Sequence, residues 1–272
     1  MCDDHRGLVQ ITRRTWLRRA SAGVMAIATA LTLERGQQGL SIAIGRPTEA
    51  EELPLQFYRA VAELNFGGTG GIAAGFDVQS HVLVRGREAT IVDTLTAGNV
   101  GLIGAALASA GLSFADVVNV VLTHMHGDHT GNLNAVLDAA PRATVFAGVE
   151  DLPRIASNRP IRPAREGDEI FGVRVIETPG HTPGHISLFD PASGTLILGD
   201  ALSNRGGQLS VLAPADSTVQ AFASLARVST LPASRALLGH GFPIERNVST
   251  VLADFASQQA IARVMDRAKN AR

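Results

Sequence analysis

Histidine and aspartate are concentrated in one short segment of the sequence. Residues 123–129 read Thr-His-Met-His-Gly-Asp-His, so three imidazoles and one carboxylate stand within six positions, at His124, His126, Asp128 and His129. Imidazole and carboxylate groups are ligands that suit zinc and the neighbouring divalent metals. Four ligands this close together do not fit comfortably around one tetrahedral ion. The spacing therefore indicates a site for two ions.

The local sequence explains how these side chains would converge. The apolar, β-branched run at residues 117–122 predicts a strand buried on both faces, and the motif follows it directly. Alternate residues at a strand end point the same way, which places His124 and His126 on one side. Gly127 allows a sharp turn that brings the next two residues back toward the same space.

Three further candidate ligands follow predicted strands downstream. His181 comes after the strand expected at 173–177, Asp200 after 195–198, and His240 after 236–238. Polar side chains in loops at strand ends commonly form active sites on a rigid sheet. His185 is an alternative to His181, but His181 lies nearer the strand end and is favoured, whereas His185 is expected to begin the next strand.

The predicted elements alternate between strands and helices. Strands are expected at 82–84, 89–92, 117–122, 143–146, 173–177, 186–189, 195–198 and 236–238, and helices at 97–112, 133–139, 217–231 and from about 248. This mixture indicates sheets covered by helices, a layered α/β (α+β) fold. The segments 153–165 and 203–216 are expected to be loops that set specificity. The arginines of the first segment are expected to be solvated, with contact to an anionic substrate as the alternative.

Composition narrows the class of protein. The 272 residues are 45% hydrophobic and 18% charged, with a formal net charge of −1 and a single cysteine at position 2. One cysteine excludes a disulfide framework, a Cys-rich zinc module and a Cys-ligated iron–sulfur cluster. A near-neutral charge with 4% aromatic residues disfavours a nucleic-acid partner.

The amino-terminal segment is similar to a twin-arginine export signal. Arg13-Arg14 is followed by an apolar run of about 14 residues, too short for a stable membrane span of ~20. We expect residues 1–43 to be a signal peptide cleaved after Ala30 or Ala43, and the mature protein to be periplasmic or secreted. A basic amphipathic helix of the fold is the alternative. Residues 44–65 are expected to form an arm or short helix, and 66–272 the catalytic domain.

The motif HxHxDH, followed by His, Asp and His in that order, resembles the metallo-β-lactamase superfamily over roughly residues 66–245. The resemblance implies an αββα sandwich and a centre for two Zn²⁺ ions, with iron or manganese as alternatives. It implies that one ion is bound by His124, His126 and His181, that the other is bound by Asp128, His129 and His240, and that Asp200 bridges them. It also implies that Asp93 orients a ligand histidine.

The resemblance implies an exported hydrolase in which a metal-bound hydroxide cleaves a small ester, lactone or related bond. Asp128 would steer the nucleophile and shuttle its proton. Aspartate at position 200 excludes the β-lactamase branch that uses a Cys ligand. The 32 residues after His240 disfavour glyoxalase II proper, which carries a helical domain there. The alternatives are another exported metallo-β-lactamase, a mono-iron persulfide dioxygenase and a non-catalytic metal-binding protein. The expected partner is a small molecule, with the oligomeric state left open.

Overall fold

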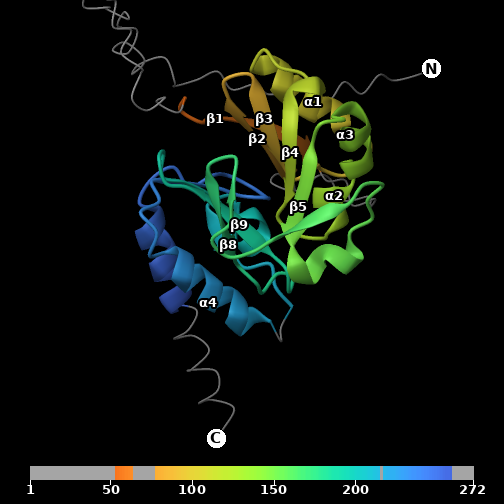
Figure 1. Cartoon of the computed structure of the whole chain (residues 1–272). Coiled ribbons are helices and arrows are strands. Elements are labelled where there is room, and N and C mark those ends of the chain that lie inside the picture. The colour runs from red at the N-terminus through yellow and green to blue at the C-terminus, as the bar shows by residue number, and fades with distance from the viewer. Residues whose placement is uncertain (1–52, 64–76, 215–216, 259–272) are drawn as a thin grey trace, which may run out of the picture. The chain divides into compact units, whose positions relative to one another are not determined.

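Two β-sheets form the frame of the structure (Figure 1). The computed structural model describes residues 53–63, 77–214 and 217–258, all within the unit Leu53–Arg272. The expected export signal at residues 1–43 and the glycine-rich segment 67–71 lie outside the described residues. The first sheet has the order β1-β2-β3-β4-β5-β6, formed by Gln56–Glu63 (β1), Asp77–Arg85 (β2), Glu88–Val92 (β3), Val117–Leu122 (β4), Thr144–Gly148 (β5) and Ile161–Ala164 (β6).

The second sheet has the order β13-β10-β9-β8-β7, formed by Arg235–Leu237 (β13), Thr195–Ile197 (β10), Ile186–Asp190 (β9), Val173–Glu177 (β8) and Glu169–Ile170 (β7). A small hairpin joins Ser203–Arg205 (β11) to Gln208–Ser210 (β12). The helices are Val100–Ser109 (α1), Gly127–Thr130 (α2), Leu133–Ala139 (α3), Thr218–Val228 (α4) and residues 248–258, with 3₁₀ turns at Phe114–Asp116 (η1), Val149–Arg154 (η2) and Gly199–Ala201 (η3).

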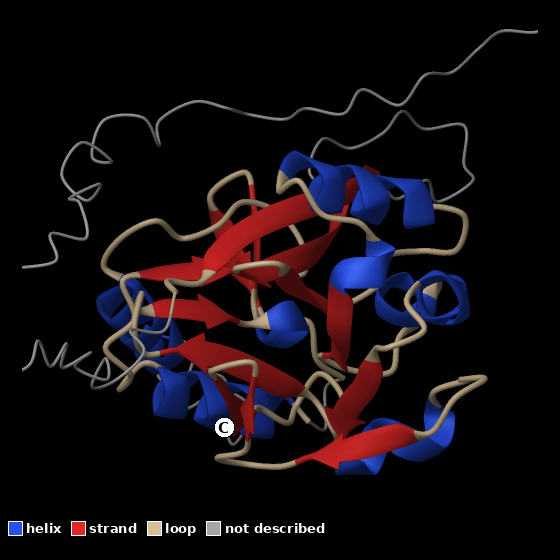
Figure 2. Cartoon of the chain, turned by 45° about the horizontal axis from the view of Figure 1, so that its top comes forward, coloured by secondary structure: helices blue, strands red, loops and turns tan. Residues whose placement is uncertain are grey.

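Three apolar clusters hold four layers together. The first cluster joins α1 and α3 to the first sheet through side chains such as Leu107 and Val136. The second lies between the two sheets. The third joins the second sheet to α4 and residues 248–258, with Leu225 and Leu252 among its members. Figure 2 shows helices on the outer sides of the sheets. The predicted αββα sandwich is confirmed.

Strand β4 shows how the sequence produces this layering. Its largely apolar run, interrupted by Asn119, predicted burial on both faces, and it pairs in parallel with β3 and β5 in the interior of the first sheet. Successive strand residues face opposite ways, so Val120 packs toward the helices while Val121 packs against the second sheet. The strand that carries the His-rich motif at its end is therefore anchored on both sides.

The domain begins earlier than the sequence suggested. Residues 56–63, expected in an arm or short helix, form β1 and pair along their length with β2. Tyr58, Ala60 and Ala62 pack into the cluster beneath α1, whereas the alternate residues Arg59, Val61 and Glu63 are exposed. This period of two, rather than the acidic residues before it, decides the local structure. The expected loops at 153–165 and 203–216 also contain strands, β6 in the first and the β11–β12 hairpin in the second.

Strand directions bring several strand ends to one edge. β3 and β4 are parallel, and β8 and β10 are both antiparallel to β9, so β8, β10 and the parallel β13 run the same way. Two backbone bonds join the sheets at this edge, from Ile186 N to Thr123 O at 2.8 Å and from Gln79 N to Gly239 O at 2.9 Å. The segments that follow these strands must therefore meet.

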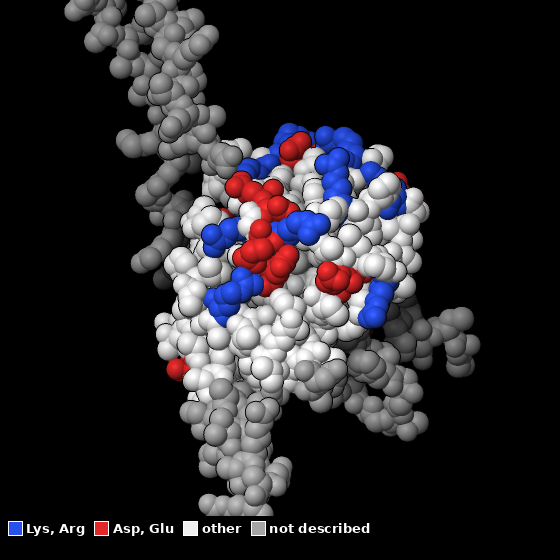
Figure 3. Space-filling view, turned by 60° about the horizontal axis from the view of Figure 1, so that its bottom comes forward, with Lys and Arg blue, Asp and Glu red and all other residues white. Residues whose placement is uncertain are grey.

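The surface carries charges of both signs. On the face in Figure 3 a group of acidic side chains is flanked by basic ones. Among the described residues, no helix combines the length and apolar character needed to cross a membrane.

Burial in the cluster between the sheets should contribute strongly to stability. Leu188 in β9 is fully buried there, so Leu188→Ala should lower the free energy of unfolding by about 2–5 kcal/mol through lost contacts and a cavity. Val219 in α4 is 60% exposed, and Val219→Ala should change it by about 0.5 kcal/mol or less. Urea unfolding followed by circular dichroism measures both, and equal losses would contradict this packing.

Candidate metal centre

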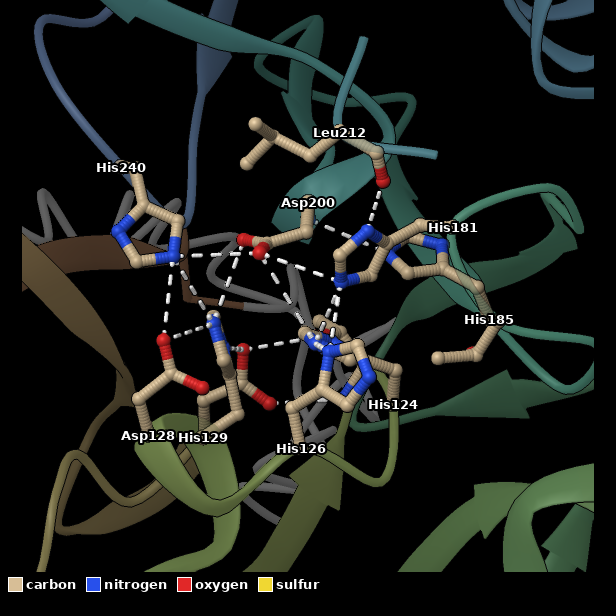
Figure 4. A network of polar contacts seen from close by, with 12 residues as sticks. His124, His126, Asp128, His129, His181, His185, Asp200, Leu212 and His240 are labelled. Atoms are coloured by element: carbon tan, nitrogen blue, oxygen red, sulfur yellow. Dashed lines mark hydrogen bonds and ion pairs between the residues drawn. The ribbon is translucent and has the colours of Figure 1, made fainter. Parts of the chain in front are cut away.

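Every candidate ligand lies just beyond a strand end at the shared edge. The His-rich motif follows β4 and runs into the single turn α2, whereas His181 lies in the loop after β8. Asp200 lies in η3 after β10, and His240 lies shortly after β13. Figure 4 shows these side chains pointing toward one another. The structure thus brings together all seven residues singled out in the sequence.

One group consists of three histidines. His126 Nδ1 lies 3.1 Å from His124 Nε2 and 2.8 Å from His181 Nε2, and the other two nitrogens are 3.1 Å apart. A tetrahedral metal with bonds of about 2.0–2.1 Å holds its nitrogens about 3.3 Å apart. The three ring nitrogens, called the first trio below, therefore have separations close to those around one ion.

A second group lies beside the first. His240 Nε2 is 3.4 Å from both Asp128 Oδ2 and His129 Nε2, and His129 Nε2 is 3.8 Å from Asp128 Oδ2. These three residues, called the second trio below, contribute one ligand atom each, all within 4.8 Å of one another. The mixed carboxylate and imidazole set suits a divalent metal.

Asp200 lies between the two trios. Its Oδ2 is 3.4 Å from His181 Nε2 and 3.2 Å from His240 Nε2, which places it against a member of each trio. Its Oδ1 is 3.3 Å from His129 Nε2. The side chain is only 3% exposed. A carboxylate in this position can serve two ions at once.

The outer nitrogens of four histidines face protein acceptors, which leaves their Nε2 atoms directed inward. His129 Nδ1 contacts Asp93 Oδ2 at 2.8 Å and His124 Nδ1 contacts Thr123 Oγ1 at 3.0 Å. His181 Nδ1 faces Leu212 O, and His240 Nδ1 faces the carbonyl of residue 77. Donation from Nδ1–H leaves the Nε2 lone pair free for a metal. This arrangement fits the metal-binding interpretation better than any single distance does.

Asp93 organises the segment before the motif. Its Oδ1 accepts a hydrogen bond from Thr123 N at 2.7 Å, and its Oδ2 accepts one from the Thr123 hydroxyl at 2.7 Å. The hydroxyl, having donated its proton, accepts from His124. The sequence drew attention to Asp93 but not to Thr123, whose only signal is its place directly before His124.

Burial and neighbouring charges shift the pKa values of these groups in different directions. Burial lowers the pKa of His124 well below its usual value. Burial would also raise the pKa of Asp200, but the charge of His129, hydrogen bonds from His129 and His240 and the charge of His124 together outweigh it and hold that pKa well below its usual range. Conversely, Asp200 and Asp93 overcome burial and raise the pKa of His129 well above its usual value.

His240 behaves like His129. Burial opposes its charge, yet hydrogen bonds to Asp128 and Asp200 raise the pKa of His240 to about 9. Among the protein's own groups, protons on these two histidines therefore balance the buried carboxylates. A divalent cation among the same atoms would take over that role, and its binding would release protons.

His185 lies behind the ligand groups rather than among them. Its Nε2 accepts a hydrogen bond from Asp200 N at 3.1 Å, and its Nδ1 lies 2.8 Å from Thr178 Oγ1. Burial, with the charge of His181, lowers the pKa of His185 to about 3, so the ring is neutral and retains this acceptor lone pair. The sequence offered His185 as the alternative to His181, whereas the structure shows it supporting the backbone of Asp200.

Glycine is required where the ligand segments approach most closely. A Cβ at Gly239 would lie 2.1 Å from Asp200 Oδ1 and 2.9 Å from His129 Cε1. Contacts this short do not occur in proteins, so any side chain at position 239 would displace the carboxylate. The glycine before His240 is therefore part of the shape of the centre.

The arginines of segment 153–165 have different surroundings. Arg159 donates hydrogen bonds to the carbonyls of Ala140 and Ala143, just beyond the end of α3. Arg154 extends over Met125, with Nη1 3.9 Å from its sulfur. Arg159 thus satisfies helix-end carbonyls, a structural function that the sequence did not suggest.

Sequence comparison finds related proteins that match part of the chain. It is 30% identical over 172 residues to the uncharacterized protein YobT of Bacillus subtilis (strain 168), a match covering 55% of this chain and 70% of YobT. It is 36% identical over 166 residues to a hydroxyacylglutathione hydrolase of Alkalilimnicola ehrlichii, covering 58% of each. The chain thus spans less than two thirds of that hydrolase.

Solved structures share the fold. A metallo-β-lactamase family protein from Thermus thermophilus, TTHA1429, has a TM-score of 0.60 at 23% identity, covering 75% of this chain and 79% of that one. TTHA1623, solved in a di-iron-bound form, has a TM-score of 0.53 at 27% identity, covering 70% and 100%. The family model of the metallo-β-lactamase superfamily matches residues 74–240, more than half of the sequence and all seven candidate ligands. The chain belongs to the metallo-β-lactamase superfamily of metal-dependent hydrolases.

Proposed function

We propose that this chain is a dinuclear metal-dependent hydrolase that cleaves a small ester, thioester or lactone after export. The observation that carries the proposal is the set of inward-facing Nε2 atoms, fixed by acceptors on their outer nitrogens and adjoined by Asp128 and Asp200. The first trio would hold one ion, the second trio the other, and Asp200 would contact both. The hydroxyacylglutathione hydrolase among the relatives supports hydrolysis of an acyl bond.

Bound divalent ions supply a water of lowered pKa and positive charge for a developing oxyanion. The protein's own groups position and move protons. Asp128 is the candidate proton acceptor because its side chain is 30% exposed, whereas Asp200 is 3% exposed. Asp128 Oδ2 also lies 3.4 Å from His240 Nε2, so the carboxylate stands directly beside the other ligand atoms of the second trio.

Zinc is the proposed metal, with iron as the competing one. Nitrogen and oxygen ligands in trios suit zinc, while the di-iron form of TTHA1623 shows a relative of this fold binding iron. Metal content by mass spectrometry, paired with lactone, ester, thioester, phosphotriester and β-lactam substrates, tests the proposal. Two ions per chain and turnover of an acyl substrate would support it. One iron per chain with oxygen uptake would favour a dioxygenase.

Loss of one ligand from the first trio should abolish turnover. Chelation should inactivate the wild-type protein and added Zn²⁺ should restore it. In His126→Ala, only two of the three nitrogens remain, so Zn²⁺ should not restore activity and the metal content should fall by about one ion per chain. Circular dichroism checks that the fold is retained. Full activity of the variant would refute the assignment.

Asp128→Asn should remove the proton acceptor. Turnover should fall about 10²–10⁴-fold, the usual contribution of a positioned acid–base group. Metal content is measured on the same samples because Asp128 also belongs to the second trio. A loss of turnover at unchanged metal content would support the role in proton transfer, and wild-type turnover would contradict it.

Export rests on the sequence of residues 1–43. Changing Arg13-Arg14 to Lys-Lys should keep the protein in the cytoplasm, since the arginine pair is the feature resembling a twin-arginine signal. The matched control changes Arg18-Arg19 to Lys-Lys and should leave export intact. Cell fractionation measures both, and export of the first variant would rule out this route.

A further inference from the structure

Asp151 is a buried carboxylate outside the ligand set. It lies in η2, directly after β5, and its side chain is 0% exposed. Both of its oxygens accept hydrogen bonds, Oδ2 from Met125 N at 3.0 Å and from the Thr182 hydroxyl at 2.6 Å, and Oδ1 from Gly184 N at 2.8 Å. All three donors are uncharged. A buried carboxylate needs such donors to offset its loss of hydration.

The donors belong to the two segments that carry the first trio. Met125 stands between His124 and His126, while Thr182 follows His181 directly. These donors lie 26 and 31 residues from Asp151 along the chain. The first segment comes from the first sheet and the second from the second sheet. One side chain therefore bonds to both halves of the trio at once.

The contact between η2 and the loop that carries His181 is closely packed. A Cβ at Gly184 would lie 2.4 Å from Asp151 N and 2.8 Å from Asp151 Oδ1. A Cβ at Gly148 would lie 1.9 Å from Gly184 O. Backbone therefore rests on backbone between η2 and the His181 loop. A shift of the carboxylate would be transmitted to that loop.

We propose that Asp151 is a positioning residue that sets the geometry of the first trio. It holds the His181 loop against the His124–His126 segment, so that the three nitrogens meet at 2.8–3.1 Å. Metal sites need their ligands held within about 0.5 Å of the productive geometry. The inference rests on the proposed metal function of the trio.

The second trio has a different support. Asp93 contacts His129 directly at 2.8 Å and holds Thr123. The three donors to Asp151 lie outside Asp128, His129 and His240. Loss of the Asp151 carboxylate should therefore weaken the first site selectively. This selectivity separates a positioning role from a general loss of stability.

The test is Asp151→Asn in the full chain, with Co²⁺ as the probe. The amide has the same shape, but its NH₂ group cannot accept, so one backbone N–H loses its acceptor. In the double variant with His240→Ala, only the first trio is intact. There Asp151→Asn should weaken Co²⁺ binding about 10–100-fold and change the cobalt absorption spectrum. In the double variant with His126→Ala, only the second trio is intact, and Asp151→Asn should leave its Co²⁺ affinity unchanged.

Asp190→Asn is the matched control. Asp190 is also buried and accepts hydrogen bonds from Ala192 N at 3.1 Å and Ser193 Oγ at 2.5 Å, but it lies at the end of β9 away from the centre. It should lower thermal stability without changing Co²⁺ affinity. If Asp151→Asn fails to fold, the Co²⁺ affinities of Thr182→Val and Thr182→Ser are compared instead. Only serine keeps the hydroxyl that donates to Asp151, so only Thr182→Val should bind more weakly.

The inference would be overturned if the first trio of Asp151→Asn bound Co²⁺ with wild-type affinity. If Asp151→Asn does not fold, the same result in Thr182→Val would overturn it. An equal loss in Asp190→Asn would also overturn it, because the effect would then reflect stability alone. Failure of the unsubstituted protein to bind two Co²⁺ ions would instead refute the metal centre itself. The two failures are therefore distinguishable.

Discussion

Seven side chains direct imidazole nitrogens and carboxylate oxygens into one space, four of them buried and three partly exposed (Figure 4). Lone pairs and negative charges at such separations repel one another unless positive charge lies among them. Four histidines face protein oxygen atoms with Nδ1, and this contact directs the Nε2 lone pair of each ring into the shared space. The rest of the structure supplies the rigidity to hold those groups together, through strand ends, buried carboxylates and glycines.

The rigidity comes from two sheets that share one apolar layer. Each sheet is buried on the face it turns to the other, and each is covered by helices on its far face. The ligand segments therefore begin from strands that cannot shift independently. Buried aspartates then fix the loops themselves, with Asp93 holding Thr123 and His129 and Asp151 contacting both halves of the first trio. Packing sets the coarse positions and hydrogen bonds set the fine ones.

Sequence reasoning succeeded where a local pattern decides the structure. The apolar run of β4, the helix α3 and the strand β8 were predicted at their observed bounds because the local order of apolar residues marks each of them. It missed β1, whose alternation is short and follows acidic residues. It also gave no part to Asp151, whose function depends on donors 26 to 33 residues away. A contact of that kind leaves no local signal.

The division of the ligands between the sheets constrains the order of assembly. The first sheet contributes His124, His126, Asp128 and His129, whereas the second contributes the remaining three. Each trio therefore includes a residue from the second sheet, and His240 comes last in the chain. A nascent polypeptide still lacking β13 has no complete second trio. If the proposed centre holds two ions, their capture must await closure of the sandwich, and metal loading would then be a late event that reports a correctly finished fold.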